Sequence, residues 1–194
     1  WGGAGSVLTI GHSTDYTIFK GTENFLAILA SLSRSTVPFV AYISESIADP
    51  QIKKQYESYI QKNHLSGVVH FVGNIDESRL ADYYRSLDVF VYTGSMVSAG
   101  GSTASLSVLE AQACSTPVIR SRGDDQEIQE GITGFYINPR NHKHASSVMQ
   151  KFYMLSTKEK SAMRKSARKY VCDRFSWDAT GRVLLATAKN LISS

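Results

Sequence analysis

The sequence contains no apolar run that approaches the length needed to cross a bilayer. Its first residues, Trp1–Gly5, have neither the charged nor the apolar region of a secretory signal, and we interpret them as a linker remnant from a larger protein. Internal repeats and low-complexity tracts are also lacking. What is there is a chain of 194 residues with ordinary apolar content, enough for one domain with a sizeable core.

Cysteine is scarce, because only Cys114 and Cys172 occur, far apart and in helix-like segments. This pattern favours buried free thiols in a reducing compartment over a disulfide, so we expect a cytoplasmic protein. The net charge of +4 suits anionic small ligands or a membrane surface. It is too small and too unclustered for a nucleic-acid-binding protein, and we expect no nucleic acid partner.

The histidines show no spacing that is typical of a metal site, so we expect no bound metal. Asp124 and Asp125 are adjacent acids that would fit a metal, but solvated loop acids or a helix N-cap are favoured. The sequence has no nucleophile elbow and no P-loop motif, which excludes two common enzyme classes.

Short apolar strands alternate with amphipathic helices, a pattern typical of an α/β protein with a parallel sheet. The predicted strands are Ser6–Ile10, Phe39–Ile43, Val68–Val72, Val89–Tyr92, Val118–Arg120 and Phe135–Ile137. The predicted helices between them are Thr22–Ser33, Pro50–Asn63, Glu77–Ser86, Ser102–Ala113 and Asp125–Glu130. After the last strand, helices are predicted at His142–Leu155, Lys158–Cys172 and Asp178–Ile192. We therefore expect a Rossmann-like sheet of about six strands with flanking helices and a helical C-terminal tail.

Ligands of open α/β sheets bind beyond the carboxyl ends of the strands. The expected ligand loops are Gly11–Gly21, Gly73–Glu77, Thr93–Ser102 and Ser121–Asp125. Lys20 and Gly21 end the first loop, where the lysine can bring a positive charge to a phosphate and the glycine lets the backbone approach closely. A solvated loop lysine is the alternative.

The most informative segment is the run of small residues at 94–105, which leads into a helix that carries Glu110. Unpaired N–H groups at such a helix start form a phosphate site, although a plain strand-to-helix connection is the alternative. By helical spacing Glu110 shares a stripe with three apolar residues, and we expect that stripe to face the sheet. The three residues are Leu106, Leu109 and Ala113. A buried carboxylate needs a partner, and a sugar diol would supply two hydroxyl donors.

Several segments are specific when they are taken together and in order. They are the strand at 7–11 followed by Lys20-Gly21, the segments 70–75, 80–84 and 88–91, the run Leu-Glu-Ala-Gln-Ala-Cys-Ser-Thr-Pro-Val-Ile at 109–119, the segments 126–128 and 131–136 with Pro139, and Phe-Ser-Trp at 175–177. In this order the chain resembles the C-terminal, nucleotide-sugar-binding half of the retaining group-one glycosyltransferases, the glycogen-synthase-like family with a GT-B fold.

The resemblance implies a role for individual residues. Lys20 would contact the donor diphosphate, and Glu110, the second acid of the family's Glu-x7-Glu motif, would bind the ribose hydroxyls. Backbone groups at Asn74 and Ile75 would read the nucleobase edge. The implied donor-binding positions are Gly11, His12, Lys20, Asn74, Ile75, Ser102, Thr103, Ser105, Leu106 and Glu110. The donor would be a UDP-, GDP- or ADP-linked sugar, bound without a metal or another cofactor.

Three places depart from the family pattern, one of them Asp124-Asp125, which stand where the family has a glycine pair before Glu127. Ser102 stands where the first acid of Glu-x7-Glu is expected, so no catalytic residue is assigned in this chain. His12 replaces an arginine, and a neutral imidazole is a poorer diphosphate partner than a guanidinium group. We therefore expect a glycosyltransferase donor-binding domain, with a non-catalytic nucleotide-sugar-binding or scaffold subunit as the alternative. Another sugar-nucleotide enzyme of the same two-domain architecture, such as an epimerase, is a weaker alternative.

The resemblance also divides the chain. Residues 6–177 would form the nucleotide-sugar-binding domain, and residues 178–194 a helix that packs back on an N-terminal domain outside this sequence. That domain would hold the acceptor, a glycan, lipid or protein, so this chain alone is expected to be an incomplete and inactive hexosyltransferase. Basic residues crowd segment 158–169, where a solvated face is favoured over peripheral contact with an anionic membrane.

Overall fold

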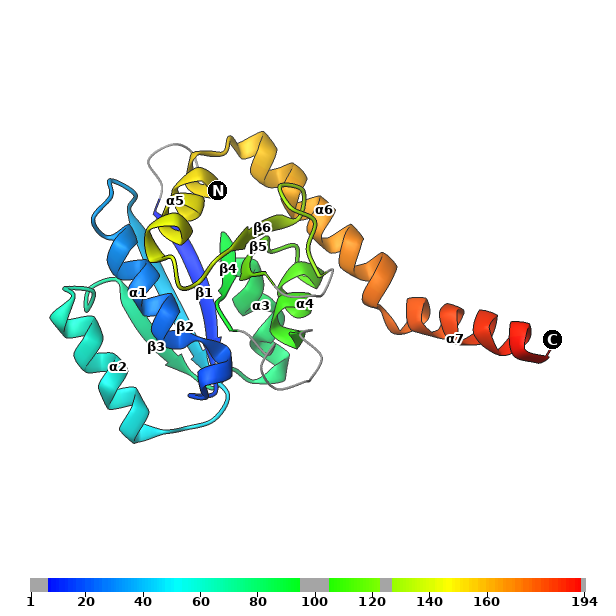
Figure 1. Ribbon diagram of the computed structural model, residues 1–194, viewed down its shortest axis with the longest axis horizontal. Coiled ribbons are helices and arrows are strands. Elements are labelled where there is room, and N and C mark those ends of the chain that lie inside the picture. The colour runs from blue at the N-terminus through cyan, green and yellow to red at the C-terminus, as the bar shows by residue number, and fades with distance from the viewer. Residues whose placement is uncertain (1–6, 95–104, 123–126, 193–194) are drawn as a thin grey trace.

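The computed structural model describes residues 7–94, 105–122 and 127–192. A six-stranded parallel sheet forms its centre (Figure 1). The strands are β1 (Leu8–Thr14), β2 (Phe39–Glu45), β3 (Val69–Gly73), β4 (Val89–Tyr92), β5 (Val118–Ser121) and β6 (Gly134–Ile137). They lie in the order β3-β2-β1-β4-β5-β6, so the direction of strand addition reverses between β1 and β4. The predicted Rossmann-like α/β class is confirmed.

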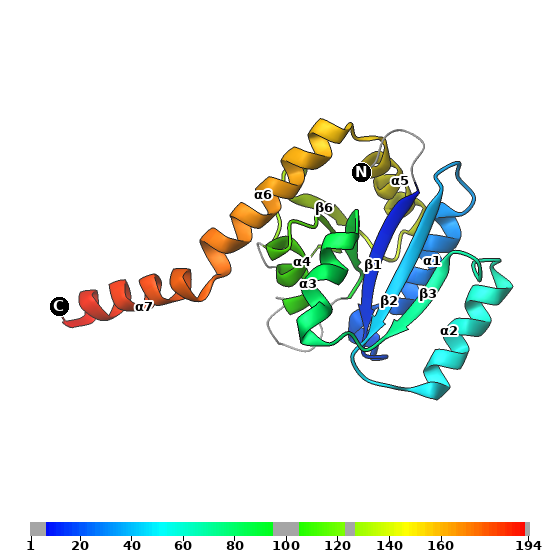
Figure 2. The same ribbon diagram turned by 180° about the vertical axis from the view of Figure 1, so that it is seen from behind.

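Helices cover both faces of the sheet (Figures 1 and 2). On one face α1 (Thr22–Leu32) packs against α5 (His142–Met154) and α2 (Pro50–Lys62). On the other face α3 (Glu77–Ser86) packs against α4 (Leu106–Ala113), and α6 (Thr157–Phe175) lies on α4. Each layer has its own buried apolar cluster, one with Ile10 and Phe25 and one with Phe90 and Val108.

The alternation of side chains along β1 explains how its residues face these two layers. Leu8 and Ile10 are buried in the cluster under α1. Gly11 faces the other way, where an added Cβ would lie 2.1 Å from Cδ1 of Leu87. A side chain at Gly11 would therefore displace Leu87 from the core beside α3.

Two arginines of α6 join this helix to the ends of its neighbours. The Arg164 guanidinium donates to the carbonyls of Leu87 and Ser115, just beyond α3 and α4. Arg168 donates to the carbonyl of Ala113, the last residue of α4. Cations at helix C-termini satisfy carbonyls that have no partner within the helix and complement its dipole. Two of the basic side chains in segment 158–169 therefore bind backbone carbonyls of the protein itself.

The last helix, α7 (Trp177–Ile192), extends away from the rest of the fold (Figures 1 and 2). Ala179 is its buried residue, whereas Trp177 is 90% exposed. The exposed apolar residues of α7 also include Val183, Leu184, Leu185, Leu191 and Ile192. An amphipathic helix with such a face has the pattern of a helix that packs against another surface.

Three local predictions were wrong. The strand predicted at Ser6–Ile10 runs instead from Leu8 to Thr14, because residues 11–14 pair with β2. Residues 127–130 form no helix, and Glu130 makes an isolated bridge to Gly134. The two cysteines are free, as expected, but Cys172 is exposed and Cys114 only half-buried. Within the described part of the chain, no helix combines the length and apolar character needed to cross a membrane.

Candidate functional site

The switch point of the sheet lies between the carboxyl ends of β1 and β4. The connections after these two strands lead to helices on opposite faces of the sheet. Here the loop that carries Lys20 meets the end of β4. Gly21 has a φ of 67°, and an added Cβ would lie 2.4 Å from the carbonyl oxygen of Thr93. The Thr93 hydroxyl donates to the carbonyl oxygen of Gly21 at 2.7 Å. Glycine is therefore required at 21, and half-buried Lys20 sits directly beside the switch point.

His12 and Gly11 lie within β1 rather than in the predicted ligand loop, which corrects their predicted placement. His12 is fully buried and stacks on Phe25. Its Nδ1 lies 2.8 Å from the carbonyl oxygen of Val91, and its Nε2 lies 3.1 Å from the Thr22 hydroxyl. Burial lowers the pKa of His12 to about 4, so the ring is neutral at pH 7. His12 joins β1 to β4 and α1, and its contacts leave no nitrogen for a diphosphate.

The loop after β3 carries Asn74 and Ile75, the residues expected at a nucleobase. Gly73, with a φ of 70°, turns the chain out of the strand. Asn74 is exposed and Ile75 half-buried, and both line a cleft of about 620 Å³ between the sheet and α3. The other described lining residues are Thr9, Tyr42, Val72, Asp76, Arg79, Asp82, Tyr83 and Ser86. Neither Lys20 nor Glu110 is among them, so this cleft adjoins only the β3 side of the rim.

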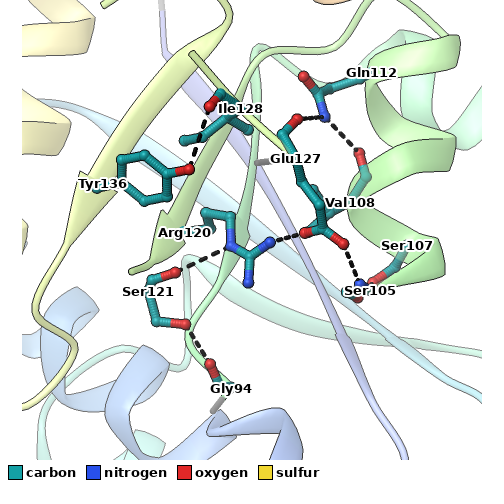
Figure 3. A network of polar contacts seen from close by, with 10 residues as sticks. All are labelled: Gly94, Ser105, Ser107, Val108, Gln112, Arg120, Ser121, Glu127, Ile128 and Tyr136. Atoms are coloured by element: carbon teal, nitrogen blue, oxygen red, sulfur yellow. Dashed lines mark hydrogen bonds and ion pairs between the residues drawn. The ribbon is translucent and has the colours of Figure 1, made fainter. Parts of the chain in front are cut away.

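A buried ion pair fixes the start of α4 (Figure 3). Arg120 of β5 and Glu127 are 2% and 0% exposed, and their side chains point toward one another. The Glu127 carboxylate also accepts the backbone N–H of Ser105, the N-cap residue of α4. The side-chain amide of Gln112 donates to the Glu127 carbonyl at 2.8 Å. These bonds couple α4 to β5 and to the segment that follows it.

This geometry changes the predicted phosphate site at the helix start. The Ser105 N–H is engaged by Glu127, so it is not available to an anion. Leu106, the first residue of α4, is 74% exposed and stays a candidate through its backbone. Ser102 and Thr103 lie outside the described residues.

Glu110 lies on α4 but not on the face that the sequence predicted. The residues of α4 that are buried are Ser107, Val108, Ala111 and Gln112. Glu110 is half-buried, and its Oε2 accepts the Tyr84 hydroxyl of α3 at 3.0 Å. Burial, then the charge of Glu110, raises the pKa of Tyr84, so its hydroxyl stays a donor. The carboxylate therefore has a partner within the protein, so its need for a partner does not by itself point to a sugar diol.

Sequence reasoning missed Tyr84, Arg120 and Glu127 as parts of the site. One signal was present: Arg120 is a charged residue inside a strand that is otherwise buried, and such a residue needs a partner. Among the described residues, no group of three or more histidine, cysteine or acidic side chains is placed to hold a metal ion.

The sheet order and the close contact between Gly21 and Thr93 define an open α/β domain. Domains of this class bind ligands beyond the carboxyl ends of the strands, at the switch point. The comparisons with known proteins then give the family. The family model for glycosyl transferases group 1 matches residues 9–170, which is most of the chain. The chain belongs to this family.

Individual relatives agree with this assignment. D-inositol 3-phosphate glycosyltransferase 2 of Catenulispora acidiphila is 31% identical over 122 residues, 60% of this chain and 26% of that protein. The crystal structure of a glycosyltransferase from Rickettsia africae has a TM-score of 0.81 at 21% identity, covering 96% of this chain and 48% of that one. Anabaena HepE, solved in complex with UDP and glucose, has a TM-score of 0.78 at 16% identity, covering 95% and 48%. The chain thus spans about a quarter of that curated relative and about half of these solved chains.

Proposed function

We propose that this chain is the donor-binding domain of a glycosyltransferase and binds a nucleoside-diphosphate sugar at the rim formed by the ends of β1, β3 and β4. The observation that carries the proposal is the switch point, where the Lys20-Gly21 loop packs on Thr93. Open α/β sheets bind nucleotides at this point of the fold. The UDP in the HepE structure supports the ligand class.

The residues divide the donor between them. Lys20 contacts the diphosphate, and backbone groups at Asn74 and Ile75 contact the edge of the base. The Glu110 carboxylate accepts hydrogen bonds from the ribose hydroxyls. The start of α4 adds the positive end of a helix dipole near Leu106. A cation and fixed backbone dipoles stabilise the negative charge that develops on the leaving diphosphate, which is how such a site would promote sugar transfer.

The acceptor belongs to a second domain outside this sequence. The exposed apolar face of α7 supports the proposal that this helix packs on that domain. We propose residues 6–177 as the donor-binding unit and residues 178–194 as the connecting helix. The chain alone then binds donor without transferring sugar, and the complete enzyme acts as a hexosyltransferase that retains the anomeric configuration.

Calorimetry with UDP, GDP and ADP on the chain tests the donor site. We expect one nucleotide to bind best and Glu110→Ala to weaken it about tenfold, because hydrogen bonds to a charged group are lost. The 2′-deoxy form of that nucleotide should also bind the wild type more weakly, but should show little further loss on Glu110→Ala. Glu57→Ala, on the exposed face of α2, is the control and should bind as the wild type does.

The outcomes separate the assignments. Equal binding of the nucleotide by wild type and Glu110→Ala would remove the ribose role of Glu110. Absence of nucleotide binding by the wild type would contradict the donor-binding proposal itself.

A non-catalytic subunit is the second candidate, because Ser102 replaces the first acid of the family motif. Ser102→Glu in a polypeptide that includes the acceptor-binding domain discriminates between the two. If the unchanged polypeptide already transfers sugar, the non-catalytic candidate is wrong. If only Ser102→Glu does so, the loss of the acid explains a loss of turnover.

A further inference from the structure

Glu45 ends β2 in a polar cluster on the β3 side of the rim, and nothing in the donor assignment uses it. It is only 8% exposed, although it is an acid at the end of β2, the strand next to the edge strand β3. Three donors from different segments converge on its carboxylate. They are the Tyr16 hydroxyl, the Lys53 ammonium of α2 at 2.9 Å and the backbone N–H of Gly73 at 3.0 Å.

Tyr16 belongs to the loop after β1 that ends in Lys20. Its φ is 62°, a left-handed conformation that is unfavourable for a residue with a side chain. The Tyr16 N–H donates to the Thr14 hydroxyl at 2.9 Å, and its ring stacks on Tyr56. Such a backbone conformation persists only where the surroundings hold it. The hydroxyl bond to Glu45 is the contact that reaches across from this loop to β2.

Gly73 belongs to the other loop, directly before Asn74 and Ile75. Its N–H is the last one of β3, and Glu45 accepts it where the register between β2 and β3 shifts. A carboxylate from the neighbouring strand therefore contacts the backbone of β3 at this irregularity. This bond sets the point at which the chain leaves the sheet toward the expected base-binding residues.

The carboxylate form is needed for these contacts. Burial opposes ionisation of Glu45, but the hydrogen bonds from Tyr16, Lys53 and Gly73 and the charge of Lys53 outweigh it, so its pKa lies below the usual value. An ionised carboxylate only accepts, which suits three donors. A glutamine would direct an NH₂ group at one of them and leave that contact unmade.

We infer that Glu45 is a positioning residue that holds the Lys20 loop and the Asn74–Ile75 loop in a fixed relation, so that one nucleoside diphosphate contacts both. This inference rests on the proposed function of the rim. Glu45 itself does not contact the ligand, and its effect on affinity depends on whether the ligand is long enough to reach both loops. Pyrophosphate contacts the Lys20 side alone, whereas a nucleoside diphosphate spans both loops.

The test compares these two ligands on Glu45→Gln by calorimetry. We expect the best nucleoside diphosphate of the panel to bind about tenfold more weakly, while the affinity for pyrophosphate stays within about twofold. Glu57→Gln, an exposed acid of α2, is the matched control and should leave both affinities unchanged. Unchanged nucleotide affinity in Glu45→Gln would overturn the inference, and so would an equal loss of both ligands, which marks a general structural defect.

Tyr16→Phe provides a second variant if Glu45→Gln does not fold. It removes one donor and leaves the carboxylate paired with Lys53 and Gly73. We expect about threefold weaker nucleotide binding with pyrophosphate unaffected, and no change in either would overturn the inference. If the wild type binds no nucleoside diphosphate at all, the proposed function fails first, which distinguishes that failure from this one.

Discussion

Two polar clusters support the rim from opposite sides of the switch point. Glu45 joins the ends of β1, β2 and β3, while the Arg120–Glu127 pair joins β5 to the start of α4. In the first cluster the cation, Lys53, is 33% exposed. In the second, Arg120 and Glu127 are 2% and 0% exposed. The same type of interaction, a carboxylate with a cation and a backbone N–H, is thus built in two very different environments.

The difference in burial predicts a difference in energetic consequence. A charge that loses its partner near the surface is rehydrated at little cost. A fully buried charge that loses its partner keeps the whole desolvation cost. The β5 side should therefore be essential for folding, and the β3 side should mainly affect ligand geometry.

The largest expected effect follows from breaking the buried pair. Glu127→Gln should lower the free energy of unfolding by about 3–5 kcal/mol, because Arg120 is left buried without its counter-ion. Urea denaturation measures it. Glu130→Gln is the matched control, since Glu130 accepts the Tyr136 N–H on the exposed surface of the same segment, and it should cost under about 1 kcal/mol. Equal losses in the two variants would remove the contrast drawn from burial.

A pH effect of intermediate size tests His12, which lies between the two clusters. Its pKa is about 4 in the folded state and about 6.5 when unfolded, so between these two pH values the unfolded chain binds this proton and the folded chain does not. The free energy of unfolding should therefore be about 2 kcal/mol smaller at pH 5 than at pH 7.5. His12→Gln should abolish most of this difference, whereas His144→Gln, exposed on α5, should preserve it. A pH dependence that survives in His12→Gln would contradict the assignment.

The smallest effect compares two adjacent tyrosines of α3. Tyr84→Phe removes the donor to Glu110, and Tyr83→Phe removes a donor to the carbonyls of His12 and Tyr42. Each should cost about 1 kcal/mol of stability, as for one hydrogen bond. Tyr84→Phe should also weaken nucleotide binding by about threefold, because Glu110 loses its fixed orientation. Tyr83→Phe keeps the ring that lines the cleft and should weaken nucleotide binding less. Calorimetry on both variants decides whether the Tyr84 contact serves the site or only the fold.

The local pattern of apolar residues was sufficient to predict the α/β class and the position of most elements. The apolar periodicity of a strand or helix lies within its own segment of the sequence. It was insufficient for the end of β1. Residues 11–14, Gly-His-Ser-Thr, have no apolar periodicity and become strand through pairing with β2. Pairing between distant segments overrides local preference in a sheet.

The site shows a similar limit. Helical spacing correctly predicted that Glu110 and Leu106 lie on the same side of α4. It was wrong in predicting that this side is buried against the sheet. The buried row contains Gln112, a polar residue that is satisfied by the Glu127 carbonyl. That partner lies fifteen positions further along the chain, and spacing within one helix carries no information about it.

The short helix α4 has consequences for the order in which the chain can fold. Eight residues span about 12 Å, too few for a helix that is stable in isolation. Glu127 binds the N–H of its N-cap residue, Ser105, and Arg168 binds the carbonyl of its last residue, Ala113, so both anchors are synthesised after it. When synthesis has reached only the end of β5, neither anchor exists yet, so α4 forms only transiently in the nascent chain. A chain truncated before α6 would lack Arg168, and the C-terminal end of α4 would then fray.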